Sequence, residues 1–89
     1  MNPKLSEAQA KVLRALRAGS RLVRTNRLNG WLFDPRVCVL FEKVYCATID
    51  SVIQHGWVTY DRRYKRMVTW RITPAGLAAL AEYEKGGDA

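Results

Sequence analysis

The stretch that most constrains the fold runs from Ala47 to Leu80 and reads ATIDSVIQHGWVTYDRRYKRMVTWRITPAGLAAL. Glycine commonly ends a helix, and Thr-Pro commonly begins one, because threonine caps the first turn and proline tolerates its first position. The pattern between these signals predicts, in order, a helix over 44–55 that ends at Gly56, a strand Trp57–Tyr60, a polar turn Asp61–Arg66, a strand Met67–Ile72 and a helix over 74–84. The pattern thus predicts a helix, a β-hairpin and a second helix over more than a third of the chain.

A further helix and a β-rich segment are predicted ahead of this stretch. Ser6 and Gln9 have the spacing of a capping box, and apolar residues recur at helical spacing as far as Gly19, which predicts a helix over 6–18. Asn29-Gly30 is a favoured hairpin turn. It predicts a hairpin of Leu22–Thr25 with Trp31–Phe33, followed by a third extended piece, Val37–Phe41.

The expected fold class is α+β, with about three helices, in a single domain. Eighty-nine residues are too few for two cores, and the 48% of hydrophobic residues is ordinary for a folded chain. We expect the domain to span residues 1–84 and a loose tail to occupy 85–89.

The sequence offers little support for an enzyme, a metal site or a membrane protein. His55 is the single histidine, and the glycines form no phosphate-binding loop, so no catalytic residue, metal ligand or cofactor is predicted. Cys38 and Cys46 lie in apolar surroundings and are interpreted as small core residues in a reducing compartment. There is no long apolar run and no signal-peptide pattern, so we expect a cytoplasmic protein without membrane contact.

Positive charge is the strongest compositional signal. The chain has fifteen Lys and Arg residues and eight Asp and Glu residues, which gives a net charge of +7. Seven cations and one anion fall between Lys11 and Arg36, and five cations and one anion between Asp61 and Arg71. Such clustering favours a polyanionic partner. The alternative interpretation is charge that serves solubility or that blocks strand edges from pairing.

Two segments resemble a known family. TIDSVIQHGWV is similar to the recognition helix of bacterial winged helix-turn-helix regulators, and WRITPAGLAAL is similar to the exit from the wing in MarR-like and PadR-like regulators. The stretch that holds the short second helix of a winged helix reads here as strands, which is a departure from the family. A looser resemblance over the whole length, in LSEAQ, RLVR, CVLF, CAT and WRIT, is to the small YjhX-type family, which is named for toxins.

The resemblance and the charge together predict a small DNA-binding protein, a phage or bacterial transcriptional regulator that binds double-stranded DNA. Each phosphate neutralised by Lys or Arg releases counterions, and polar helix side chains can reach base edges. The predicted DNA-binding residues are Arg62, Arg63, Tyr64, Lys65 and Arg66 in the basic wing, Lys43 and Tyr45 before the helix, and Thr48, Ser51, Gln54 and His55 on its outer side. Asp50 lies on the same side and would repel phosphate.

A different function stays open from the sequence. Winged helices also act as protein–protein modules, and a phage-encoded inhibitor that docks on a host nucleic-acid-handling complex would have this composition. Exposed aromatic residues, Trp31 and Phe33 or Trp57 and Trp70, would then be the anchors. For a DNA reader we expect a homodimer, because paired recognition helices meet paired half-sites.

Overall fold

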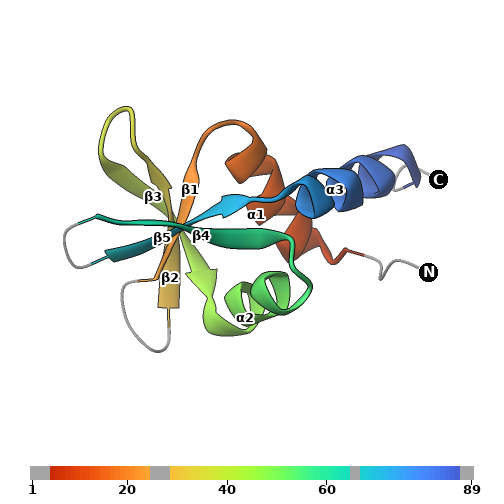
Figure 1. Cartoon of the computed structure of the whole chain (residues 1–89), viewed down its shortest axis with the longest axis horizontal. Helices are drawn as coiled ribbons and strands as arrows, with labels where there is room; N and C mark the ends of the chain where they lie inside the picture. Colours follow the sequence, from red (N-terminus) through yellow and green to blue (C-terminus); the bar gives the residue numbers. More distant parts are fainter. Residues whose placement is uncertain (1–4, 25–28, 65–66, 87–89) are drawn as a thin grey trace.

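The computed structural model describes residues 5–24, 29–64 and 67–86, and this part of the chain has α+β architecture with three helices and five strands (Figure 1). In chain order the elements are α1 (Glu7–Arg17), β1 (Arg21–Arg24), β2 (Asn29–Asp34), β3 (Val39–Tyr45), α2 (Cys46–Gln54), β4 (Val58–Tyr64), β5 (Met67–Ile72) and α3 (Pro74–Gly86). The predicted α+β class is confirmed.

The five strands form one antiparallel sheet in the order β3-β2-β1-β5-β4. Two local hairpins, β2–β3 and β4–β5, are joined by β1, which pairs Leu22 with Leu32 on one side and with Trp70 on the other. Each outer strand carries an irregularity, because the pairing skips Phe41 in β3 and Asp61 in β4. Bulges at sheet edges bend the strand and disturb further pairing.

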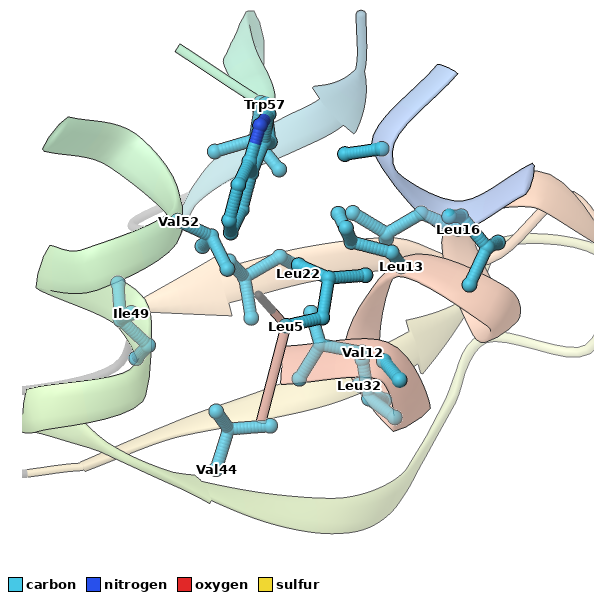
Figure 2. Close-up of a cluster of buried hydrophobic side chains, with 14 residues drawn as sticks. Leu5, Val12, Leu13, Leu16, Leu22, Leu32, Val44, Ile49, Val52 and Trp57 are labelled. Atoms are coloured by element: carbon cyan, nitrogen blue, oxygen red, sulfur yellow. The ribbon is translucent and has the colours of Figure 1, made fainter. Parts of the chain in front are cut away.

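One face of the sheet, which we call the helix face, carries the hydrophobic core. Side chains two apart on a strand share a face, and so do residues paired directly across two strands. The register therefore places the buried strand residues of the core cluster on one face: Leu22, Leu32, Val44 and Val58. Helix side chains close over them, including Leu13, Leu16, Ile49 and Val52 (Figure 2). Leu80 of the last helix belongs to the same cluster. Burying a side chain of this size stabilises the fold by about 1.5–3 kcal/mol relative to exposure, so this cluster decides where the helices dock.

The opposite face of the sheet, which we call the open face, contributes nothing to that cluster. Its members by register are Arg21, Val23, Trp31, Phe33, Leu40, Lys43, Tyr45, Thr59, Arg62, Thr69 and Arg71. The helices gather on the other side of the strands in Figure 1. Val23, Phe33 and Thr69 are nevertheless buried, so neighbouring side chains and turns of the open face shield its centre from water.

The first helix begins as the sequence predicts. Ser6 Oγ accepts a hydrogen bond from the Gln9 N–H at 3.1 Å, and Gln9 Oε1 accepts one from the Ser6 N–H at 2.8 Å, which completes the capping box. The helix ends before Gly19, whose φ of +112° suits a residue without a Cβ. A capped start and a glycine stop fix this helix locally.

The predicted turn at Asn29-Gly30 is wrong. Both residues begin β2, where Gly30 pairs with Arg24 on one side and with Val44 on the other. The hairpin of β1 with β2 exists, but its connection lies at 25–28, outside the described residues, as does the predicted strand residue Thr25. Gly30 is glycine for a packing reason, since a Cβ there would overlap the side chain of Ile49 in α2.

The predicted boundaries of the following elements also shift. Val44 and Tyr45 belong to β3 rather than to the helix, because the buried Val44 continues the strand alternation until Cys46 begins α2. The predicted strand start at Val37 is instead a turn over 35–38, in which Cys38 adopts a φ of 54°. The predicted core role of Cys38 is wrong, since its side chain is exposed, while Cys46 is half-buried.

The basic turn predicted over Asp61–Arg66 is largely strand. Asp61 to Tyr64 continue β4, and Lys65 and Arg66 lie outside the described residues. At the other end, α3 continues to Gly86, so the first two residues of the predicted tail are helical. Among the helices described, none combines the length and the apolar character needed to cross a membrane.

Candidate nucleic-acid interface

Carboxylates compensate most of the cations on the helical side of the molecule. Lys11 Nζ lies 2.6 Å from Glu42 Oε2, which ties α1 to β3. Glu84 on α3 holds Arg14 at 3.1 Å and Arg17 at 2.7 Å. These two guanidinium groups lower the pKa of Glu84 to about 2, mainly through the hydrogen bonds from Arg17 and then from Arg14. The α1 surface therefore carries little uncompensated charge.

The same compensation extends to the β1 and β2 region. Arg24 lies 3.5 Å from Asp50 on α2, so the carboxylate that would repel phosphate has a cation beside it. Arg36 holds Asp34 at 3.1 Å, and its side-chain hydrogen bond lowers the pKa of that carboxyl. The cation cluster from Lys11 to Arg36 is thus mostly paired within the fold.

Most of the uncompensated cations of the described residues lie on β3, β4 and β5, and one more, Lys85, lies on α3. Within residues 5–24, 29–64 and 67–86, Lys43, Arg63 and Arg71 have no carboxylate within ion-pair distance. Arg62 approaches Asp61 only at 3.8 Å, and its side chain is 75% exposed. Pairing inside the fold therefore leaves the positive charge of the described chain concentrated on these strands.

The strand register divides these cations between two faces. Arg62 pairs with Thr69 and Lys43 with Trp31, which places both cations on the open face. Arg71 is opposite Thr59 and shares that face. Arg63 is opposite Val68, on the helix face. The β4–β5 hairpin thus presents cations from both of its faces.

An aromatic ring lies beside Lys43 at the end of β3. Lys43 Nζ is 5.7 Å from the centroid of the Tyr45 ring, which is a cation–π distance. Tyr45 is 68% exposed. Tyr45 also occupies the N-cap of α2 without donating or accepting a side-chain cap bond, so its ring and hydroxyl are available to a ligand.

The four residues predicted to contact DNA bases, Thr48, Ser51, Gln54 and His55, differ in their surroundings. Gln54 is exposed and Thr48 is half-buried. Ser51 Oγ accepts a hydrogen bond from Gln9 Nε2 of α1, which directs Ser51 toward the neighbouring helix. His55 caps the helix and stacks on Trp57, with ring centroids 4.4 Å apart. Gln54 is therefore the best placed of the four to meet a ligand.

The wing residues are described only in part. Arg62 and Arg63 lie on β4, and Tyr64 ends that strand opposite Met67. Lys65 and Arg66 fall outside the described residues. Arg71 joins the candidate interface although it was not among the predicted contacts. Its alternation with Thr69 along β5 is a signal that the sequence already contains.

The described chain defines a small α+β protein with three helices over one face of a five-stranded antiparallel sheet. No protein-family model, no curated protein and no solved structure matches it. Within the parts of the chain that the structure describes, no three His, Cys, Asp or Glu side chains gather as metal ligands.

Proposed function

We propose that this chain is a cytoplasmic DNA-binding protein of winged-helix type that acts as a transcriptional regulator. The topology supports this proposal, because β1 pairs with β5 and β5 with β4, so that a strand from the first half of the chain completes a sheet with the β4–β5 hairpin. In this interpretation that hairpin is the wing and α2 is the recognition helix. The β2–β3 hairpin takes the place of the usual second helix.

The observation that carries the proposal is the location of the uncompensated charge. Arg62, Arg63 and Arg71 project from the wing strands, and Lys43 lies on β3 shortly before α2. Duplex DNA presents a dense row of phosphates that such cations neutralise with release of counterions. A role in solubility alone does not explain why carboxylates pair with the cations of α1 and leave the cations of these strands unpaired.

The helix contributes polar groups rather than charge. Gln54 is exposed, and an amide can donate to and accept from an adenine edge in the major groove. Asp50 forms an ion pair with Arg24 at 3.5 Å, which lessens the repulsion between this carboxylate and a phosphate. In this proposal α2 reads bases and the wing holds the backbone.

Salt dependence tests the proposal. We expect binding to any duplex to weaken steeply with salt, and Arg62→Ala with Arg63→Ala to reduce the slope of log K against log salt by about two. Arg14→Ala with Arg17→Ala is the matched control, because it removes the same charge from cations that already pair with Glu84. Equal slopes for the two double variants would contradict the proposal, as would an absence of duplex binding.

Docking on another protein is a second candidate function, and the edge strand β3 favours it. Val39, Leu40 and Phe41 are 48%, 38% and 50% exposed, and Val37 in the preceding turn is 63% exposed. Such apolar exposure on an edge strand is typical of interaction surfaces. The discriminating experiment is affinity purification with and without nuclease. A stoichiometric protein that survives nuclease, and that Phe41→Asp releases, would favour docking over DNA binding.

A further inference from the structure

The open face of the sheet contains a hollow of about 300 Å³, and Arg62 is the one proposed duplex contact among its lining residues. Arg21, Phe33 and Thr69 form its floor, on the three central strands. Pro35 and Cys38, from the turn between β2 and β3, contribute to its lining. This volume lies at the lower end of the range for small-molecule sites, so it suits one ring system rather than a larger ligand.

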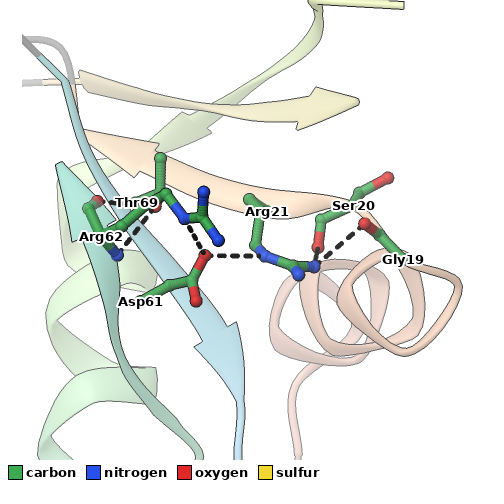
Figure 3. Close-up of polar contacts among 6 residues, drawn as sticks. All are labelled: Gly19, Ser20, Arg21, Asp61, Arg62 and Thr69. Carbon is green, nitrogen blue, oxygen red and sulfur yellow. Dashed lines mark hydrogen bonds and ion pairs between the residues drawn. The ribbon is translucent and has the colours of Figure 1, made fainter. Parts of the chain in front are cut away.

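The β4 bulge supplies the remaining side of the hollow. The pairing of β4 with β5 passes from Tyr60 to Arg62 and skips Asp61. Thr69 fixes this irregular backbone, since its hydroxyl donates to the Arg62 carbonyl at 2.7 Å and accepts from the Arg62 N–H at 3.3 Å. Bulges commonly redirect a side chain at functional sites. Asp61 and Arg62 both lie beside Thr69 here (Figure 3), and both line the hollow.

The carboxylate of Asp61 is held in one orientation. Arg21 Nε donates to Asp61 Oδ2 at 3.1 Å, while Arg21 Nη1 donates to the carbonyls of Gly19 and Ser20 at 3.0 and 3.3 Å. The Asp61 side chain is only 17% exposed. Its second oxygen, Oδ1, makes no hydrogen bond to any residue in the described ranges. The hollow therefore offers an oriented acceptor beside the donors of Arg62.

A carboxylate at this place disfavours a phosphate ligand, because two anions would repel at short distance. It favours a neutral planar group with adjacent N–H donors and an acceptor. Guanine has this pattern, since N1–H and the N2 amino group can donate to a carboxylate while O6 and N7 accept from an arginine. Apolar contact with Phe33 and Pro35 suits the faces of a ring.

We infer that the hollow binds one unpaired guanine base, with Asp61 accepting from its Watson–Crick edge and Arg62 donating to its acceptors. This inference rests on the proposed nucleic-acid function and adds an unpaired nucleotide to it. Recognition of single-stranded positions by splayed bases uses the same chemistry. Arg71 and Lys43 on the same face are then placed for the flanking phosphates.

The exposed thiol of Cys38 in the hollow lining provides the readout. The rate of Cys38 alkylation by N-ethylmaleimide is measured by peptide mass mapping, with each of the four nucleoside 5′-monophosphates present in turn. All four carry the same phosphate, so a difference among them reports the base. We expect the guanine nucleotide to slow alkylation of Cys38 severalfold more than the others, with the rate at Cys46 unchanged.

Asp61→Asn removes the charged acceptor and should abolish the preference for guanine. Asp34→Asn is the matched control, because Asp34 also pairs with an arginine near the turn over 35–38. Equal protection by all four nucleotides, or no protection, would overturn the inference even if Asp61→Asn failed to fold. That result would leave the salt-dependent duplex binding untouched, so failure of the hollow and failure of the proposed function are distinguishable.

Discussion

Gly30 of β2 lies directly against Ile49 of α2. A Cβ built on Gly30 would overlap Ile49 Cδ1 and would come within 2.6 Å of the Val23 carbonyl oxygen. Ile49 is fully buried, so it has little room to move away. The close approach of the helix to the sheet therefore depends on the absence of a side chain at position 30.

Gly30→Ala should destabilise the protein by about 1–3 kcal/mol, the usual cost of overpacking a filled core. Urea unfolding measures the loss as a lower midpoint with an unchanged slope. Ala47→Ser, at an exposed position of α2, is the control and should change the free energy of unfolding by less than about 0.5 kcal/mol. A midpoint unaffected by Gly30→Ala would contradict this account of the helix packing.

Stability should depend on the ionisation of Glu84 at acid pH. Its pKa is lowered from 4.5 to about 2 by Arg17 and Arg14, so the folded state binds the proton more weakly than the unfolded state does. The contribution is complete above about pH 4.5 and is lost as the pH falls toward 2. Melting temperature measured across this window should fall less steeply for Glu84→Gln than for the native chain. Parallel profiles would show that the pair of helices does not rely on this carboxylate.

Ser51 and Gln54 should respond differently to replacement by alanine. Ser51 bonds to Gln9 across 42 residues of sequence, so Ser51→Ala should lower stability by about 1 kcal/mol and leave base preference intact. Gln54→Ala should leave stability nearly unchanged and relax specificity by about 1–3 kcal/mol at one base pair. Competition binding to duplex libraries, with thermal unfolding in parallel, measures both. A loss of base preference in Ser51→Ala would show instead that Ser51 contacts the bases.

We expect the protein to form a homodimer through β3. This edge strand exposes Val39, Leu40 and Phe41, and it carries one Glu and one Lys in a chain of net charge +7, so repulsion between copies is weak there. Light scattering should give a dimer, and Phe41→Lys should give a monomer. Leu77→Lys, at a similarly exposed position on α3, is the control and should remain dimeric. A monomeric native chain at high concentration would reject this interface.

The elements that the sequence predicts correctly are those that depend on local signals. The capping box of Ser6 and Gln9, the stop at Gly19, and the Thr73-Pro74 helix start each depend on atoms within a few residues of one another. The three helices and the β4–β5 hairpin were predicted for this reason. The predicted turn at Asn29-Gly30 was wrong because the requirement for glycine comes from Ile49, which is distant in sequence.

The candidate site also has some features that the sequence predicts and others that only the structure shows. Composition located the surplus of cations, but strict alternation along β4 would place Arg62 on the face of Val58, and the irregular pairing at Asp61 is what puts Arg62 on the face of Arg71. Composition could not show which cations acquire partners, because the carboxylates that compensate them, such as Glu84 for Arg17 and Glu42 for Lys11, lie on other elements. The sequence by itself thus determined the three helices, the β4–β5 hairpin and the positive charge. Only tertiary packing decided where that charge stays uncompensated, that Ser51 faces α1, and that Arg21 pairs with Asp61 in a hollow, because each depends on contacts between residues far apart in the chain.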